Sequence, residues 1–257
     1  QRTMILRKIL LFAATVAISA ASLAESPPKI AIIIDDLGYQ LDAGRRAIEL
    51  PGPLSYAVLP GTPRGRLLAE AANQNGKEVL LHLPLEAVAH DGPPEPGGIT
   101  LDMTRDQFRD AFAAALESVP FAIGVSSHRG SLLTRHPGHM EWLMQEIRTR
   151  RGLFFIDSYT HHKSVALRIA REAGVAAAKR DVFLDSDRSP QALAQEFARL
   201  KMLARENGVA VGIGHPYPET LEFLERELRA MDGEDFELIP ISEALGGYVE
   251  PRMASTF

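Results

Sequence analysis

No cysteine occurs among the 257 residues of this chain. Its absence excludes a disulfide framework, a thiol nucleophile and any metal site built from thiolates. The sequence also lacks the Gly-Lys-Ser/Thr of a phosphate-binding loop and the Gly-x-Ser-x-Gly turn of serine hydrolases, so neither chemistry is expected. What remains for chemistry is a set of carboxylates and histidines.

An excess of basic charge is missing too. The formal net charge is −5 at pH 7 and the pI is about 5.9, so we expect no nucleic-acid partner. Hydrophobic residues make up 46% of the chain and charged residues 24%, which suits one large globular domain of α/β barrel size, or two small ones. Neither an internal repeat nor a second domain boundary is apparent.

The N-terminal apolar run, residues 9–21, is too short for a comfortable membrane span. Arg7 and Lys8 precede it, and Ser22-Leu23-Ala24 follows it. A positive start, a short apolar core and small residues at the end predict a secretory signal peptide over residues 1–24, with an uncleaved anchor as the alternative. We therefore expect export to the periplasm or beyond the cell, and no stable membrane span after cleavage.

The rest divides into a predicted domain over residues 25–246 and a tail, 247–257, expected to be poorly ordered. Within the domain, apolar strand-like runs alternate with helical patterns, which predicts a parallel barrel or a doubly wound sheet. The predicted strands are 30–34, 54–59, 78–81, 121–125, 153–156, 175–178, 209–213 and 237–239. The predicted helices are 42–49, 64–75, 105–119, 137–150, 164–173, 190–207 and 218–231.

The first of these runs, Ile30–Ile34, ends in two adjacent carboxylates, Asp35 and Asp36. A β-branched apolar run is typical of a strand buried on both faces, and such sheets keep their chemistry at the carboxyl ends of the strands. Successive strand residues point to opposite sides, so we expect the two aspartates to lie in different environments. A loop start with a helix-capping aspartate is the simpler alternative.

Polar residues follow the later strands as well. If the strands are parallel, these side chains project from one face and converge in one cleft. A single histidine at a strand end can equally cap a backbone group, but several on one face favour a site. The polar sets are His82 to Glu86, Ser126 to Ser131, Asp157-Ser158, Lys179 to Asp181 and His215.

An aspartate and two histidines form a suitable ligand set for zinc or a similar divalent ion. A spare carboxylate beside such a site can act as general base, and a spare histidine as general acid. Of the other histidines, His136 and His139 are expected at the surface, and His161 or His162 could reach the cleft. The long irregular stretch 87–101, which contains His90, could form one wall of that cleft.

Five segments together resemble the divergent polysaccharide deacetylase family, exported relatives of esterases that remove N-acetyl groups from chitin-like and peptidoglycan sugars. The resemblance covers about residues 28–245. It rests on Ile-Ile-Ile-Asp35-Asp36-Leu-Gly, Leu-Leu-His82-Leu-Pro-Leu-Glu86, His128-Arg-Gly-Ser131, Phe-Phe-Ile-Asp157-Ser158 and Gly-Ile-Gly-His215-Pro.

The resemblance implies a distorted parallel (β/α) barrel of about seven strands, with Asp35 as base, Asp36 and His82 as metal ligands and His215 as general acid. The second histidine of the family's ligand motif is Glu86 here. The third ligand is therefore Glu86 or His128, of which we favour His128. Further expected site residues are Asp157 as a catalytic residue, with Glu86, Ser131 and Arg180 as additional ones.

These features predict an exported, metal-dependent hydrolase, with Zn²⁺ as the expected ion, that removes acetyl groups from an N-acetylated, peptidoglycan-like glycan. One alternative is a catalytically silent barrel of the same fold that binds glycan or an envelope protein. Another is hydrolysis of a different ester or amide at the same metal.

Overall fold

The computed structural model describes residues 26–88, 95–150, 152–231 and 235–245. The predicted signal peptide, His90 and the predicted tail lie outside these residues. Within them, no helix combines the length and apolar character that crossing a bilayer requires.

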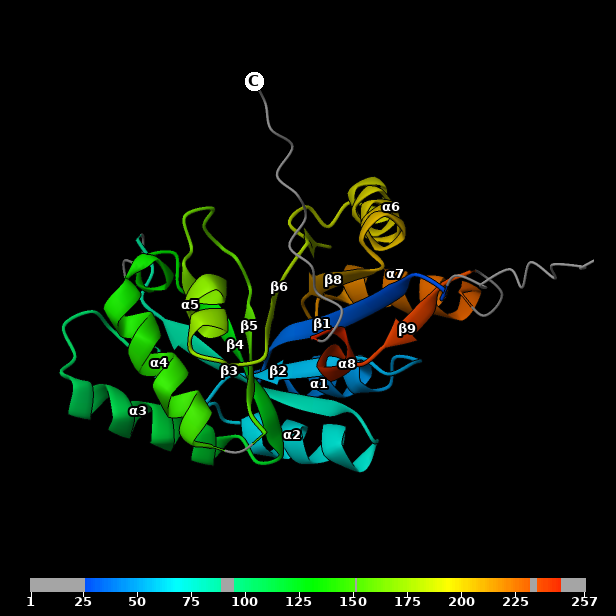
Figure 1. Ribbon diagram of the computed structural model, residues 1–257. Coiled ribbons are helices and arrows are strands. Elements are labelled where there is room, and N and C mark those ends of the chain that lie inside the picture. Colours follow the sequence, from blue (N-terminus) through cyan, green and yellow to red (C-terminus); the bar gives the residue numbers. More distant parts are fainter. Residues whose placement is uncertain (1–25, 89–94, 151, 232–234, 246–257) are drawn as a thin grey trace, which may run out of the picture.

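A curved, wholly parallel sheet organises the described residues (Figure 1). Its hydrogen-bonded order is β6-β5-β4-β3-β2-β1-β8-β7, and the short β9 pairs with β1 beside β2. This arrangement confirms the predicted distorted parallel barrel. The strands are β1 (Lys29–Leu37), β2 (Ser55–Val58), β3 (Glu78–Leu85), β4 (Ala122–Arg129), β5 (Phe154–Asp157), β6 (Ala177–Lys179), β7 (Val182–Phe183), β8 (Val209–Gly214) and β9 (Glu237–Ile239).

Helices connect the successive strands, except β6 and β7, and cover the outer side of the sheet, whereas the short α8 packs against β1 and β8 from the other side (Figure 1). The helices are α1 (Leu41–Ile48), α2 (Gly65–Gln74), α3 (Arg105–Ser118), α4 (Pro137–Thr149), α5 (Ala166–Glu172), α6 (Pro190–Asn207), α7 (Pro218–Ala230) and α8 (Ile241–Ala244), with a 3-10 turn η1 (Leu133–Arg135) before α4.

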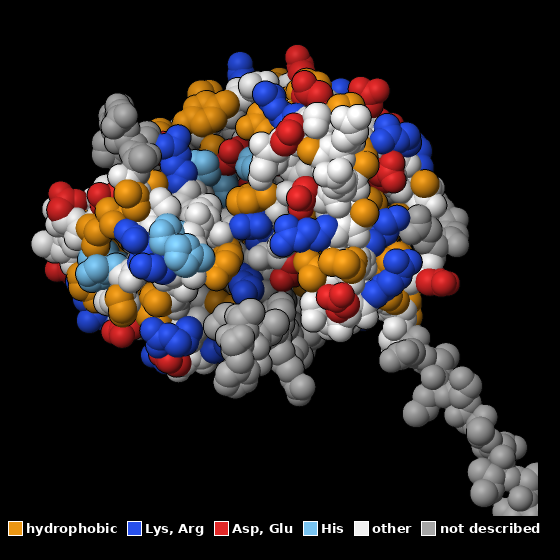
Figure 2. Space-filling model, turned by 90° about the horizontal axis from the view of Figure 1, so that it is seen from above, with side chains coloured by type: hydrophobic (Ala, Val, Ile, Leu, Met, Phe, Trp, Pro, Cys, Tyr) orange, Lys and Arg blue, Asp and Glu red, His pale blue; other side chains and the backbone are white. Residues whose placement is uncertain are grey.

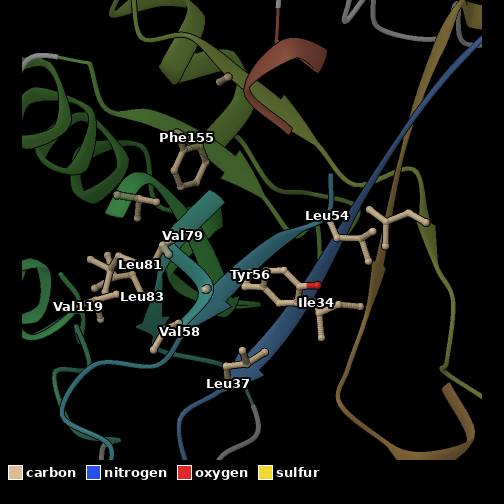
Figure 3. Packing of buried hydrophobic residues seen from close by; sticks show 14 of the residues in the cluster. Ile34, Leu37, Leu54, Tyr56, Val58, Val79, Leu81, Leu83, Val119 and Phe155 are labelled. Carbon is tan, nitrogen blue, oxygen red and sulfur yellow. The ribbon is translucent and has the colours of Figure 1, made fainter. Parts of the chain in front are cut away.

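The alternation of side chains along each strand divides the core in two. On β1, Ile30, Ile32 and Ile34 belong to the large cluster beneath the helices. Ala31 and Ile33 face the inner side of the curve and join a smaller cluster with α8. Figure 3 shows part of the large cluster, where side chains from β1, β2 and β3 pack around a buried tyrosine, Tyr56.

This inner face ends in polar residues at the carboxyl edge of the sheet. Continuing the alternation beyond the inner apolar residues leads to Asp35 on β1, His82 on β3 and His215 after β8. The same count on β4 leads from Gly124 through Ser126 to His128. The sheet therefore brings together polar side chains that lie far apart in the sequence.

The helix ends follow the sequence signals. Thr104 and Gln107 form a capping box at the start of α3, and Ser189 caps α6, which has Pro190 in its first turn. One strand was missed: β7 has only two residues, too few for an apolar run to stand out.

Candidate metal centre

A bulge at the end of β1 sets the direction of both aspartates. Ile34 pairs with Tyr56 and Leu37 with Val58, so two residues of β1 oppose one of β2. Asp36 adopts a left-handed backbone with φ of +62°. The expectation that the two carboxylates would point to opposite sides is therefore wrong, because the extra residue breaks the alternation.

Both carboxylates instead approach the same imidazole nitrogen. Asp35 Oδ2 lies 3.5 Å and Asp36 Oδ1 3.2 Å from His82 Nε2. Their environments still differ as expected, since the side chain of Asp35 is 2% exposed and that of Asp36 is 32% exposed. The two aspartates can therefore serve different roles at one centre.

Asp36, His82 and His128 form a compact three-atom group. His128 Nδ1 is 2.9 Å from Asp36 Oδ1 and 3.1 Å from His82 Nε2. Each residue offers one ligand atom, and the three atoms come from the ends of β1, β3 and β4. Within the part of the chain that the structure describes, this is the group whose geometry could hold a metal ion.

The outward nitrogen of each histidine is bonded to a partner of its own. His82 Nδ1 lies 2.7 Å from Ser126 Oγ, and His128 Nε2 lies 3.0 Å from a carboxylate oxygen of Glu95. Arg129 in turn pairs with the other Glu95 oxygen at 2.9 Å. Partners of this kind fix the ring orientation and leave the inward nitrogen available as a ligand.

The group fits a divalent cation on its own geometry. Tetrahedral zinc with bonds of about 2.0–2.1 Å separates its ligand atoms by roughly 3.3 Å, close to the separations of Asp36, His82 and His128. Asp35 Oδ1 is buried and accepts no hydrogen bond from the described residues, and Asp36 Oδ1 is buried against the two imidazole nitrogens of His82 and His128. Two imidazole nitrogens and buried carboxylate oxygens this close together require a shared proton or a metal ion between them.

The pKa values of the two aspartates move in opposite directions. Burial raises the pKa of Asp35, although the neighbouring His82 and His215 oppose that shift. Burial alone would also raise the pKa of Asp36, but the adjacent His128 and His82 outweigh it and hold the pKa well below its usual range. Asp36 is therefore the more acidic carboxyl group of the pair, and Asp35 the more basic one.

His215 faces the same centre from β8, with Nε2 at 3.8 Å from Asp36 Oδ2. Its Nδ1 lies 2.8 Å from Asp185 Oδ1, and Asp185 Oδ2 accepts hydrogen bonds from the His215 backbone and from Thr220 Oγ1. Burial alone would lower the pKa of His215, but the buried Asp185 carboxylate outweighs it and raises the pKa to about 9. His215 is thus held as an imidazolium near neutral pH.

Asp157 and Arg180 lie beside this centre. The Asp157 carboxylate accepts hydrogen bonds from the Tyr159 backbone and from Ser164 Oγ, at 2.9 and 2.6 Å. Arg180 donates to the carbonyl oxygens of Ser158 and Tyr159 and stacks on Phe183. These contacts shape the turn after β5, and a catalytic role for Asp157 stays a prediction.

Glu86 and Ser131 serve the long connection after β3. Glu86 Oε2 accepts a 2.7 Å hydrogen bond from the Leu101 backbone, and Ser131 Oγ accepts one from the Val88 backbone at 3.1 Å. Of the two alternatives for the third ligand, His128 lies within the three-atom group. The expected surface position of His139 is wrong, because its side chain is buried, with Nδ1 at 3.0 Å from His136 Nδ1.

Sequence reasoning missed three partners of the histidines. Asp185 follows β7, the strand that was also missed, and it sits at an inner-face position two residues after Phe183. Ser126 was included only as part of a polar run, although it directly opposes His82 in the register. Glu95 carried no local signal beyond its place in the long stretch 87–101.

Comparison with known proteins agrees with this architecture. A family model described as divergent polysaccharide deacetylase matches residues 32–245. YibQ, an uncharacterized protein of Escherichia coli strain K12, is 37% identical over 247 residues, which cover 96% of this chain and 75% of that protein.

Two solved structures show the same fold. An uncharacterized protein from Agrobacterium tumefaciens C58 has 22% identity and a TM-score of 0.81, covering 86% of this chain and 90% of that one. The catalytic domain of a peptidoglycan N-acetylglucosamine deacetylase from Eubacterium rectale ATCC 33656 has 14% identity and a TM-score of 0.51, covering 87% and 93%. At these low identities the structural likeness concerns the fold alone.

Proposed function

The chain belongs to the divergent polysaccharide deacetylase family, and from this premise we propose that it is a metal-dependent deacetylase of an N-acetylated cell-envelope glycan. The observation that carries the proposal is the group formed by Asp36, His82 and His128, flanked by a buried carboxyl on one side and a paired histidine on the other. Metal-assisted hydrolysis of an acetamide can use these three functions together: a Lewis acid, a base and an acid.

Asp36, His82 and His128 would hold the ion, and Ser126 and Glu95 would orient the two imidazoles. A divalent cation bound there lowers the pKa of water towards about 7 and polarises an amide carbonyl. We propose Zn²⁺ because two imidazoles and one carboxylate, without thiolates, are a frequent ligand set of catalytic zinc.

Asp35 is the proposed general base. It adjoins the ligand group, with its Oδ2 at 3.5 Å from His82 Nε2, and its Oδ1 has no donor among the described residues. Burial raises its pKa, which makes its carboxylate a stronger proton acceptor than an exposed aspartate. Asp35 would take the proton from the attacking water.

His215 is the proposed general acid. A pKa of about 9 keeps it protonated at neutral pH, and Asp185 binds Nδ1 so that Nε2 faces the centre. It would donate its Nε2 proton to the nitrogen of the sugar as the C–N bond breaks, so that the amine leaves in a neutral form. Asp35 and His215 thus approach the reacting amide from different strands.

Export is part of the proposal. The signal-like segment over residues 1–24 supports a periplasmic or secreted location, where cell-envelope glycan is accessible. The named deacetylase with the same fold acts on peptidoglycan N-acetylglucosamine, which supports a glycan of that class as substrate.

The proposal is tested by acetate release. The zinc-loaded protein is incubated with chito-oligosaccharides and with peptidoglycan, and released acetate is quantified. Asp35→Asn should retain bound zinc but lose about 100-fold or more in rate, because general-base catalysis typically contributes at least that factor. Asp110→Asn, at an exposed position on α3, is the matched control and should keep full activity.

Bound zinc without acetate release from any substrate would refute the enzymatic proposal. If the Asp35→Asn protein still binds the glycan in that case, the chain is a glycan-binding barrel of the same fold. Equal rates for Asp35→Asn and Asp110→Asn would refute the role of Asp35 alone.

A further inference from the structure

A pocket with two exposed tyrosines lies beside the candidate metal centre. It has a volume of about 270 Å³, and Asp36 and His215 form part of its wall. Tyr39 and Tyr217 line it as well, and their side chains are 54% and 38% exposed. The mechanism proposed above uses neither tyrosine.

The pocket is built from adjacent connections at the carboxyl edge of the sheet. Tyr39 lies between β1 and α1, and Tyr217 lies between β8 and α7, directly after Pro216. The two strands are neighbours in the sheet, so their connections face each other. Figure 2 shows a hollow on one face of the molecule with histidine and acidic side chains inside it and Lys and Arg side chains on its border.

A basic residue from a third connection stacks on Tyr217, one of the residues that line this pocket. Arg188, between β7 and α6, places its guanidinium carbon 4.7 Å from the centre of the Tyr217 ring. Arg188 is exposed, and no carboxylate of the described residues pairs with it. Stacking orients the guanidinium plane while its N–H groups stay available for a ligand.

The chemistry of the lining favours a sugar. A tyrosine combines a flat apolar face with a hydroxyl group, and neither Tyr39 nor Tyr217 uses its hydroxyl in a hydrogen bond within the described residues. The apolar face of a pyranose can cover such rings, and its hydroxyl groups can bond the tyrosine hydroxyls and Gln40, which also lines the pocket. The free guanidinium adds a place for one carboxylate.

We propose that this pocket binds a pyranose ring of an acidic glycan, with a carboxylate of that glycan paired with Arg188. The inference rests on the proposed function in taking an N-acetylated glycan as the ligand. The adjacent His215 would then face the nitrogen of the bound sugar. The carboxylate can belong to a lactyl ether or to a uronic acid, and the two sources are separated by the choice of probe.

Binding is measured by calorimetry on the zinc-loaded protein carrying Asp35→Asn, so that turnover does not interfere. The probes are neutral chitotetraose, an oligosaccharide of N-acetylglucosamine and lactyl-bearing N-acetylmuramic acid, and one of N-acetylglucosamine and glucuronic acid. The tighter of the two acidic probes identifies the source of the carboxylate. Zinc content is determined for every variant.

Tyr39→Ala and Tyr217→Ala should each raise Kd about fivefold for all bound probes, the range of an aromatic contact. Arg188→Gln should raise Kd about tenfold or more for the preferred acidic probe, and less than about twofold for chitotetraose, since a charge-assisted hydrogen bond is lost. Phe121→Ala and Arg168→Gln are matched controls. Phe121 is an exposed aromatic before β4, and Arg168 pairs with Glu172 on α5.

The inference is overturned if both tyrosine variants bind every probe as the parent does, or if Arg188→Gln weakens neutral and acidic probes equally. If the zinc-loaded protein releases acetate but these variants bind the probes unchanged, the role of the pocket is refuted and the proposed function stands. If these variants lose binding but the zinc-loaded protein releases no acetate, the role of the pocket in glycan binding stands and the proposed enzymatic activity is refuted.

Discussion

Glu95 offers a sharp test of the metal centre, because it touches a candidate ligand without being one. Its carboxylate lies 3.0 Å from His128 Nε2 and is paired with Arg129. The change to test is Glu95→Gln, which keeps the size and one acceptor oxygen but removes the charge. We expect the variant to fold normally and to bind zinc more weakly.

The size of the effect follows from the contact. The Glu95 side chain is 20% exposed, so solvent screens the contact only in part. A hydrogen bond to a charged acceptor is worth about 1.5–3 kcal/mol and a neutral one about 1 kcal/mol, so the change costs about 0.5–2 kcal/mol, with a midpoint of about 1.3 kcal/mol. This corresponds to about a tenfold rise in the Kd for zinc, at the low end of what partners of metal-bound histidines contribute.

The sign of the pH dependence is a second readout. Burial alone would lower the pKa of His128, but Asp36 and Glu95 outweigh it and raise the pKa. Removing the Glu95 charge therefore lowers the pKa of His128, and protons compete less with zinc for Nδ1. The affinity gap between variant and parent should be widest at alkaline pH and narrow as the pH falls.

Zinc affinity is measured by competition with a chromophoric chelator after the protein has been stripped of metal. Glu86→Gln is the matched control, since Glu86 is a carboxylate at the start of the same connection, hydrogen-bonded to the Leu101 backbone and outside the ligand group. The reasoning fails if Glu95→Gln binds zinc within twofold of the parent. If Glu86→Gln weakens zinc binding as much as Glu95→Gln does, the effect belongs to the connection in general. If Glu86→Gln weakens zinc binding more, Glu86 is the third ligand.

Three further predictions concern zinc binding, the pKa of His215 and the turn after β1. Zinc at 100 times its Kd should stabilise the parent protein against thermal unfolding by about 2.7 kcal/mol. The same zinc concentration should not stabilise the Asp36→Ala variant, and an equal stabilisation of that variant would contradict the proposed ligand set. Asp185→Asn should lower the pKa of His215 from about 9 and shift the alkaline limb of the kcat/KM profile to lower pH by about one unit or more, whereas an unshifted limb would exclude His215 as the acid. Gly38→Ala should reduce the free energy of unfolding in urea by about 2–4 kcal/mol, because its Cβ would overlap the Thr62 side chain at a φ of +143°. Gly76 is the control, because its φ is +67° and a Cβ there would meet no other atom within 4 Å. Gly76→Ala should therefore reduce the free energy of unfolding by only about 1–2 kcal/mol. Equal losses of stability in the two variants would disprove the overlap at Gly38.

Much of the fold was predictable because its signals are local. The capping box at Thr104, the cap at Ser189 and the left-handed glycine at Gly208 mark helix ends through contacts within a few residues. Apolar runs such as Ile30–Ile34 identify strands in the same way. The two-residue β7 has no such run, and Asp185 was missed together with it.

Strand alternation could have sharpened the site further. On β5, Phe154 and Ile156 face the inner cluster, so the same count leads to Ser158 rather than Asp157. Ser158 Oγ indeed contacts Asp35 Oδ2 at 3.5 Å, while Asp157 turns to Tyr159 and Ser164. The sequence shows that a residue at a strand end is polar. The side of the sheet to which its side chain points follows only when the inner face of that strand is known.

The sequence by itself determined that Asp35, Asp36, His82, His128 and His215 lie at the ends of parallel strands, because apolar periodicity and turn residues are read within short segments. Only the tertiary structure decided how they meet. The register of β1 against β2 inserts the extra residue that turns Asp36 towards His82. Pairing of β3 with β4 brings together imidazoles 46 residues apart, and the packed connection after β3 returns Glu95 to His128. Such contacts depend on backbone pairing between distant segments, which no local pattern encodes.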